Sequence, residues 1–224
     1  CSDQHQHQHQ HPHRHQQLDP TTDMLTLHGD HRSGNCYKIE LALAQLGLDY
    51  QFVDVDILRG QSRTPEFLAK NANGKIPLLQ LDDGRCLAES NAILCYLADG
   101  TPLWPTERYL RAQVLQWLFF EQYSHEPYIA TARFIVQYLG RPAERAADLA
   151  AKMAPGHRAL AVMEQQLSGQ PFLCGSDYTI ADIALYAYTH VADEGDFDLS
   201  PFPDIAAWLQ RVRAQPGHVA MIRS

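Results

Sequence analysis

The chain has 224 residues and a mass of 25.3 kDa, enough for one large domain or two modest ones with a buried core. Its formal charge of −8 argues against a nucleic acid as the natural partner, because proteins that bind phosphate backbones concentrate Lys and Arg on one face. With 45% hydrophobic and 20% charged residues and no apolar run long enough to cross a bilayer, the composition predicts a globular protein that does not enter a membrane.

Five cysteines are scattered through the chain, with no Cys-x-x-Cys pair and no spacing typical of metal ligands. Free thiols in a reducing compartment fit this pattern better than a disulfide framework. We therefore expect a cytoplasmic protein without a metal site.

Residues 1–23 differ in composition from everything that follows. They hold six of the twelve histidines, alternating mostly with Gln, and such a low-complexity segment cannot build a core. We interpret the segment as an affinity tag or a disordered natural extension, whose imidazoles would bind Zn²⁺ or Ni²⁺ adventitiously. A physiological metal site is the less favoured alternative.

From residue 24 onward the pattern first predicts a βαβ unit. An apolar stretch at 24–29 that ends in Gly predicts a strand, and apolar residues at helical spacing over 39–48 predict a helix with Gly47 near its end. The alternating segment 50–57 predicts a second strand, parallel to the first.

A hairpin and a further helix complete the first half. After a short helical or irregular piece around 65–68, two apolar runs at 76–81 and 86–88 are separated by a turn containing Asp83-Gly84, a strong hairpin signal. Glu89 and Ser90 then open an apolar-periodic helix over 92–97.

Residues 100–107 contain Gly100, Pro102 and Pro105 and are typical of a linker. Beyond them only helical periodicity is found: a long helix from about 110 to 123, its continuation to 139 after an interruption at Pro127, and helices within 143–167, 180–192 and 205–212. The sequence therefore predicts an α+β fold, with a βαβ-ββα domain at 24–99 and an all-α helical bundle at 108–224.

The chemistry of the chain is concentrated in three motifs, of which the first is the loop before the first helix. It reads Ser33-Gly34-Asn35-Cys36, and taken alone its Ser and Asn could be no more than helix-cap and turn residues.

The other two motifs together describe a receptor for a short peptide. A cis bond between Ile76 and Pro77 would turn the backbone N–H and C=O of Ile76 outward, free to pair with another peptide as an added strand. Glu89 and Ser90 at a helix start supply a carboxylate, a hydroxyl and bare N–H groups, which together can hold the ammonium and carboxylate of an amino-acid head group.

The order of these features closely resembles that of the cytosolic glutathione transferases, over roughly residues 24–224. A Ser-containing loop, a Gly-Lys-Ile-Pro turn, a Glu-Ser helix start and an all-helical second half follow one another at that family's separations. The resemblance implies a thioredoxin-like first domain, a cis peptide bond at Pro77 and glutathione as co-substrate. It also implies a homodimer in which the first domain of one subunit meets the helical domain of the other.

The family's glutathione-binding residues carry over by position. Ile76 would pair with the cysteinyl backbone of glutathione, Glu89 and Ser90 would hold its γ-glutamyl group, and Lys75 could reach one of its carboxylates. Asn91 stands where many relatives carry a basic residue.

The resemblance also implies a subtype. His28 occupies the place of the catalytic Tyr of tyrosine-type members, which disfavours that type. Ser33, aligned on Lys38-Ile39, occupies the place of the Cys of cysteine-type members. The Ser-Gly-Asn spacing is similar to the Thr-Pro-Asn loop of the bacterial nu-like members, so Ser33 and Asn35 are the expected donors to the glutathione sulfur.

A donor at the glutathione sulfur has only to lower the pKa of the thiol. A thiol with an ordinary pKa of about 8.5 is mostly protonated at neutral pH, and lowering that pKa by two units requires about 2.7 kcal/mol of differential interaction. Ser33 is therefore expected to stabilise the thiolate rather than to attack. Cys36, on the first turn of the helix, is expected to have a lowered pKa and is the alternative thiol for chemistry with glutathione.

The helical half is expected to line the second-substrate pocket, with His125, Tyr128 and Arg133 as candidates. Thr179 and Asp182 form a capping box that we interpret as structural.

Three functions remain open at this point. The favoured one is conjugation of glutathione to small apolar electrophiles by positioning and thiolate stabilisation. The alternatives are glutathione-dependent reduction of a disulfide or peroxide, and non-catalytic ligand binding on the same fold.

Overall fold

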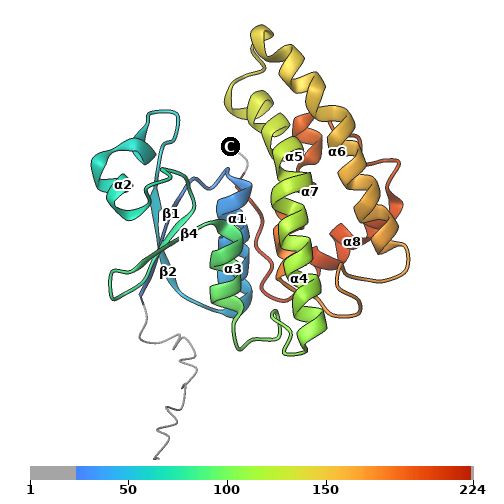
Figure 1. Ribbon diagram of the computed structural model, residues 1–224, viewed down its shortest axis with the longest axis horizontal. Helices are drawn as coiled ribbons and strands as arrows, with labels where there is room; N and C mark the ends of the chain where they lie inside the picture. The colour runs from blue at the N-terminus through green and yellow to red at the C-terminus, as the bar shows by residue number, and fades with distance from the viewer. Residues whose placement is uncertain (1–23, 223–224) are drawn as a thin grey trace, which may run out of the picture.

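The computed structural model describes residues 24–222, so the interpretation of the segment at 1–23 lies outside the described residues. A four-stranded sheet with its helices occupies one side of the molecule and a helical bundle occupies the other (Figure 1). Among the described residues beyond 100 no strand is present, and the only β pairing is an isolated bridge between Phe172 and Gly175. The predicted α+β architecture is confirmed.

The sheet has the strand order β2-β1-β3-β4, and its strands are β1 (Leu25–Gly29), β2 (Tyr50–Asp54), β3 (Leu78–Gln80) and β4 (Cys86–Ala88). β1 and β2 are parallel, whereas β3 is antiparallel to both β1 and β4. β2 is shorter than the predicted 50–57 because the chain turns at Asp56, whose N–H is bonded to the Gln61 side chain (2.7 Å). β3 begins only at Leu78 because it follows Pro77, which has no N–H to donate.

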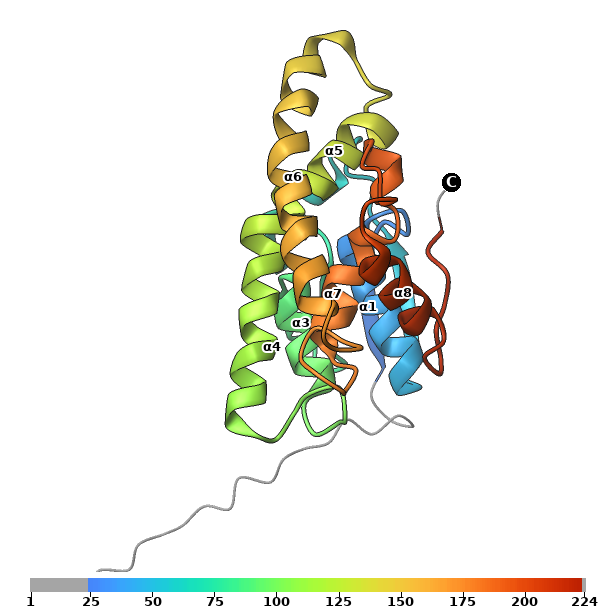
Figure 2. The same cartoon turned by 90° about the vertical axis from the view of Figure 1, so that its right-hand side faces the viewer.

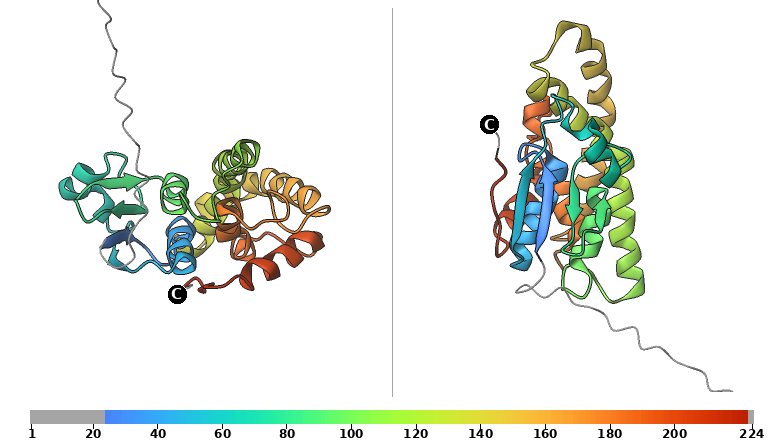
Figure 3. Two further views of the ribbon diagram at one scale, coloured as in Figure 1. Left: turned by 90° about the horizontal axis from the view of Figure 1, so that it is seen from below. Right: turned by 90° about the vertical axis from the view of Figure 1, so that its left-hand side faces the viewer.

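Three helices belong to the first half: α1 (Gly34–Leu46), α2 (Pro65–Lys70) and α3 (Ser90–Ala98), with a 3₁₀ turn at Gln61–Arg63 before α2. α1 begins earlier than its apolar periodicity because its first turn is Gly-Asn-Cys, and it ends at Gly47 in the left-handed conformation (φ 65°). α1 and α3 lie between the sheet and the helical bundle, and α2 lies at the far end of the molecule from the bundle (Figure 3).

The helical half begins with one long, irregular helix. α4 (Arg108–Phe120) passes through a π-helical segment (Glu121–His125) into α5 (Glu126–Arg133) and a second π-helical segment (Phe134–Tyr138). The predicted interruption at Pro127 is therefore wrong. The preceding π turn shifts the hydrogen-bond pattern just where proline lacks its N–H, so the helix continues.

The remaining helices are α6 (Ala146–Leu167), α7 (Ile180–Thr189) and α8 (Pro203–Arg213), with short 3₁₀ turns at Ala143–Arg145 and Ala192–Gly195. α6 packs against both α5 and α8 (Figure 2). Residues 99–107 contain neither helix nor strand. No helix in the described part of the chain has the length and apolar character needed to cross a membrane.

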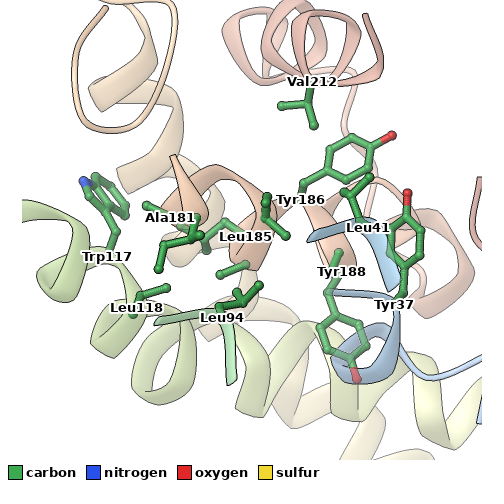
Figure 4. Packing of buried hydrophobic residues seen from close by; sticks show 14 of the residues in the cluster. Tyr37, Leu41, Leu94, Trp117, Leu118, Ala181, Leu185, Tyr186, Tyr188 and Val212 are labelled. Atoms are coloured by element: carbon green, nitrogen blue, oxygen red, sulfur yellow. The ribbon is translucent and has the colours of Figure 1, made fainter. Parts of the chain in front are cut away.

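α7 is the centre of the core, because every one of its residues is buried. Its Ala181 and Leu185 face Leu94 of α3 and Leu118 of α4 (Figure 4). One hydrophobic cluster thus runs from the helices of the sheet into the bundle, which fixes the relative position of the two halves.

The predicted capping box at the start of α7 is confirmed. Thr179 Oγ1 accepts from the Ala181 N–H (3.3 Å), and Asp182 Oδ2 accepts from the Thr179 N–H (3.0 Å). Asp182 Oδ1 also accepts from Leu173 N–H and Trp208 Nε1, so this carboxylate joins α7 to α8.

Candidate functional site

Ser33 lies where the loop after β1 meets α1. Its carbonyl accepts from the Tyr37 N–H (2.9 Å), so Ser33 is the N-cap of α1, but its side chain makes no capping hydrogen bond. The side chain instead belongs to the lining of a cavity. The Ser33 hydroxyl is therefore not used as a helix cap, although it lies within hydrogen-bond reach of the Cys36 thiol.

The helical half holds this loop in place. Arg133 Nη1 donates to the Arg32 carbonyl (2.7 Å), while its Nε pairs with Glu194 (2.6 Å). Gly34 lies against Tyr188 of α7, where a Cβ would come within 2.5 Å of the ring, and the hydroxyl of Tyr188 accepts from the Asn35 N–H (3.3 Å). Ser33 is thus positioned by contacts from α5 and α7.

The larger of two adjoining cavities, about 420 Å³, opens between the halves of the molecule. Two exposed cations, Arg63 and Lys75, are in its wall, and Arg63 is oriented by a bond to the Asn73 carbonyl (2.9 Å). The first half contributes Ser33, Asn35, Ile57, Ser62, Arg63, Gly74, Lys75 and Ile76, and the second half contributes Glu126, Ala130, Thr131, Arg133, Phe134, Tyr138 and Tyr188.

The smaller cavity, about 100 Å³, shares Asn35, Lys75, Ile76 and Glu126 with the larger one. Its other lining residues are Asn71, Pro77, Glu89, Ser90 and Gln122. The structure therefore brings the turn motif and the Glu-Ser motif together, next to the loop that carries Ser33.

The Ile76-Pro77 bond is cis, and the turn before it is held by Asn71, whose Nδ2 donates to the Lys75 carbonyl (2.8 Å). Across residues 24–222, none of the backbone hydrogen bonds outside helices and strands involves Ile76. Its peptide groups are thus available to a ligand. Glu89, just before α3, has a φ of 70°, an uncommon left-handed conformation for a residue with a side chain.

A buried ion pair that the sequence analysis missed lies behind the smaller cavity. Lys38 Nζ is 2.8 Å from Glu121 Oε1, and both side chains are fully buried. Lys38 also donates to Asn35 Oδ1 (2.8 Å) and Ser90 Oγ (3.2 Å), and it lies 3.5 Å from Asn91 Oδ1. A positive charge from α1 therefore lies beside Asn91 and Ser90 at the start of α3.

Asn35 links this network to the helical half. Its Oδ1 accepts from Lys38 and from Ser90, and its Nδ2 donates to Glu126 Oε1 (3.3 Å). The role of Asn35 as a donor to the glutathione sulfur stays a prediction.

The expectation for Cys36 is wrong. Its side chain is fully buried, and this burial raises the pKa of the thiol to about 12, outweighing the hydrogen bonds from the Asp30 N–H and the Ser33 side chain. Desolvation disfavours a charged thiolate more than the helix N-terminus favours it. Cys36 is therefore not an activated thiol in this structure.

Two of the three predicted second-substrate residues are not in the cavity wall. His125 is buried and pairs through Nε2 with Thr189 Oγ1 (2.9 Å), and Tyr128 lies beside Lys152 (5.8 Å from Nζ to the ring centre). Arg133 does line the cavity, although Arg32 and Glu194 occupy its guanidinium. The orientation of α5 is the reason, because this helix turns residues 126, 130, 131 and 133 toward the cavity and positions 125 and 128 away from it.

Comparison with known proteins agrees with this geometry. The family model of the glutathione S-transferase N-terminal domain matches residues 25–99, and that of the C-terminal domain matches residues 117–216. The chain belongs to the glutathione S-transferase family. Its first domain accordingly has the thioredoxin-like fold that the sequence resemblance implied.

Several members of the glutathione S-transferase family are similar to this chain over most of their own length. A glutathione S-transferase structure from Pseudomonas fluorescens Pf-5 is 62% identical, with a TM-score of 0.87 over 88% of this chain and 98% of that one. The disulfide-bond oxidoreductase YfcG of Escherichia coli K12 is 32% identical over 191 residues, 81% of this chain and 87% of the relative. The structure of Ure2p in complex with glutathione is 25% identical, with a TM-score of 0.77 over 86% of this chain and 90% of that one.

Among residues 24–222, no group of three or more His, Cys, Asp or Glu side chains is arranged to hold a metal ion.

Proposed function

We propose that the protein is a glutathione transferase that joins the glutathione sulfur to small apolar electrophiles. The observation that carries this proposal is the pair of adjoining cavities, the smaller with the Glu-Ser motif and the larger with Ser33. The similarity to Ure2p, whose structure was solved with glutathione, supports the choice of ligand.

Glutathione would lie across both cavities. Its γ-glutamyl carboxylate would meet the Ser90 hydroxyl and the start of α3, where unpaired N–H groups favour an anion. Its cysteinyl backbone would pair with Ile76, and its glycyl carboxylate would lie near Lys75 and Arg63. The sulfur would then lie near Ser33.

Ser33 would stabilise the thiolate. Its hydroxyl is not used as a helix cap, and it stands at the N-terminus of α1, where both a donor and the helix dipole favour an anion. The electrophile would occupy the larger cavity, against Ala130 and Phe134 of the helical half. Catalysis would consist of lowering the thiol pKa and holding the two reactants together.

Reduction of disulfides is the second candidate, because YfcG is named a disulfide-bond oxidoreductase and the Ser-Gly-Asn loop resembles the nu-like type. In this reaction the glutathione thiolate would attack a substrate disulfide directly. No thiol of the protein is required, which is consistent with the burial of Cys36.

A parallel assay of wild type and Ser33→Ala separates these possibilities. It would measure addition of glutathione to a chromogenic chloro-nitroarene, reduction of a small disulfide, and glutathione affinity. Removing one preorganised donor to an anion commonly costs about 10²–10³ in kcat, and we expect a loss of at least about tenfold here, with affinity preserved. The assay in which the wild type is active and Ser33→Ala is impaired identifies the reaction.

Ser62→Ala is the matched control, because Ser62 lines the same cavity without lying at the start of α1. Full activity in Ser33→Ala would contradict the role of Ser33 and make Asn35 the next candidate. Tight glutathione binding by a wild type that is silent in both assays would favour the non-catalytic alternative.

A further inference from the structure

A separate cavity lies where the linker meets the helical half. Its volume is about 420 Å³, equal to that of the larger cavity of the site, and small-molecule sites typically measure about 300–1,000 Å³. We call it the linker cavity. It is lined by Pro102, Leu103, Pro105, Leu110, Cys174, Asp177, Tyr178, Thr179 and Gln215.

The linker cavity is distinct from the proposed glutathione site. It shares no lining residue with either of the two adjoining cavities. Thr179 in its wall is the N-cap of α7, whereas Tyr188 in the wall of the larger cavity lies near the other end of this helix. The rise of an α-helix separates these two positions by roughly 14 Å. A ligand in the linker cavity therefore need not compete with glutathione.

Most of the wall is apolar and fixed in place. Two prolines, two leucines and the ring of Tyr178 supply its apolar surface. The Leu103 carbonyl accepts from the Ile180 N–H (3.2 Å), which ties the linker to the start of α7. The Tyr178 ring packs edge-on against Phe172, with 5.5 Å between the ring centres. Such a wall fits a flat apolar group, as small-molecule sites commonly do.

The side-chain donors of the wall are already used inside the protein. The Tyr178 hydroxyl donates to Gln45 Oε1 (3.1 Å), and the Thr179 hydroxyl donates to Asp182 Oδ2 (3.3 Å). Burial raises the pKa of the Cys174 thiol to about 12, so this group is neutral at pH 7 and only a weak donor. An anionic ligand would therefore find no strong side-chain donor here.

Two acceptors, in contrast, remain open. Asp177 is the one charged residue in the lining, and among residues 24–222 its carboxylate forms no hydrogen bond or ion pair. Gln215 donates through Nε2 to the Arg211 carbonyl (3.1 Å), which leaves its Oε1 as an acceptor. Arg111, whose Nε donates to the carbonyl of Pro105 (3.0 Å), is not in the lining. The polar part of the wall thus favours a ligand that is positively charged and rich in donors.

We propose that the linker cavity binds small organic cations in which an ammonium group is attached to a flat apolar ring. The ring would lie against the prolines, the leucines and Tyr178, and the ammonium would donate to the Asp177 carboxylate and Gln215 Oε1. The larger cavity has the exposed cations Arg63 and Lys75 in its wall, so the two cavities favour ligands of opposite charge.

The test is a calorimetric titration of the full chain with three probes. Naphthylmethylammonium carries the ring and the charge, naphthylmethanol carries the ring alone, and methylammonium carries the charge alone. Each titration is run with and without saturating S-methylglutathione, which occupies the proposed glutathione site. Asp177→Asn removes the charge at nearly constant shape, and Asp193→Asn, at an exposed position outside this lining, is the control.

We expect wild type and Asp193→Asn to bind naphthylmethylammonium with a Kd of about 1 mM or tighter, whether or not S-methylglutathione is present. Naphthylmethanol should bind about threefold to tenfold more weakly, because the carboxylate is at the exposed edge of the cavity. In Asp177→Asn the ammonium probe should bind no more tightly than the alcohol.

Four results would overturn the assignment. They are a wild type that binds no naphthylmethylammonium or binds it no better than the alcohol, an Asp177→Asn variant that keeps the preference, displacement of the probe by S-methylglutathione, and equal binding of methylammonium. The last of these would indicate ion pairing at the surface without use of the cavity.

Discussion

Lys38 and Glu121 place two opposite charges inside the protein, where the helices of the sheet meet the bundle. Their contact (2.8 Å) is surrounded by polar partners: Lys38 donates to Asn35 and Ser90, while Glu121 Oε2 accepts from Asn91 (3.0 Å). Two of these partners line the smaller cavity. The ion pair therefore supports the proposed glutathione site from behind, without facing the ligand.

Replacing Lys38 with Met should destabilise the fold. The variant leaves the Glu121 carboxylate buried without its partner, and breaking a buried pair in this way typically costs about 3–5 kcal/mol. Urea denaturation of wild type and variant would measure the change. Arg59→Met is the control, because Arg59 is 82% exposed and its contact with Asp56 is long (3.7 Å).

The double variant Lys38→Met with Glu121→Leu tests the cause of that loss. Removing both charges removes the unpaired carboxylate, so the double variant should recover much of the stability. A double variant as unstable as Lys38→Met alone would show that lost packing, not the uncompensated charge, is responsible.

The predicted site residues that line the two cavities come mostly from short local motifs. Ser33, Ile76-Pro77 and Glu89-Ser90 each stand at a recognisable strand or helix end, and the cavities gather all three motifs. The ion pair of Lys38 was missed because its partner Glu121 comes from another element, which no local pattern reveals. The presence of Lys38 between the buried Tyr37 and Ile39 was the one available signal.

The order of strands and helices could be predicted from the sequence. The residues at which they end, and the side of each helix that faces a cavity, could not. Apolar periodicity located α1, α3, α4 and α7, and the Asp-Gly turn located the β3–β4 hairpin. The π-helical segment at Glu121–His125 has no periodic signature, since it inserts one extra residue into a turn. This shift moves His125 to the interior and turns Glu126 toward the cavities.

The buried position of His125 predicts a pH dependence of stability. Burial lowers the pKa of His125 to about 4, below the ordinary value of 6.5. Above pH 6.5 the imidazole is neutral in both states. As the pH falls from 6.5 toward 4 the unfolded chain takes up the proton first, so the folded state loses about 3 kcal/mol over this range.

His125→Gln removes the titrating group and keeps a donor for Thr189. Denaturation midpoints should therefore fall more steeply in wild type than in this variant between pH 6.5 and 4, with parallel curves above pH 7. The difference between the two curves cancels other groups, such as Asp182, whose pKa burial raises to about 6. Parallel curves throughout the range would show that His125 is not the responsible group.

At the scale of the whole molecule, the two halves form one body with the site between them. The hydrophobic cluster is continuous through α1, α3 and α7, and Arg133 ties the Ser33 loop to the bundle. The fold of each half was predicted correctly from the sequence. The lining of the cavity, however, depends on how the two halves pack against each other. This packing is the reason that the second-substrate residues could not be chosen from helical periodicity alone.

The outer face of α4 and of the π-helical segment after it carries an exposed apolar surface that bears on the predicted homodimer. Phe119 is 69% exposed and Tyr123, one turn further along, is 85% exposed. Large aromatic side chains gathered in this way often mark an interface between proteins. We therefore predict that α4 supplies part of the contact through which the helical half of one subunit meets the first domain of the other.

Sedimentation equilibrium at micromolar concentration should give a mass about twice the 25.3 kDa of the chain. Changing both Phe119 and Tyr123 to Glu should shift the protein to the monomer, because dimerisation would then bury carboxylates without a counter-charge. Val162→Glu, at a half-exposed position of α6, should leave the mass unchanged. A wild-type mass near that of a single chain would refute the homodimer, whereas a dimer that tolerates both substitutions would place its interface away from this face of α4.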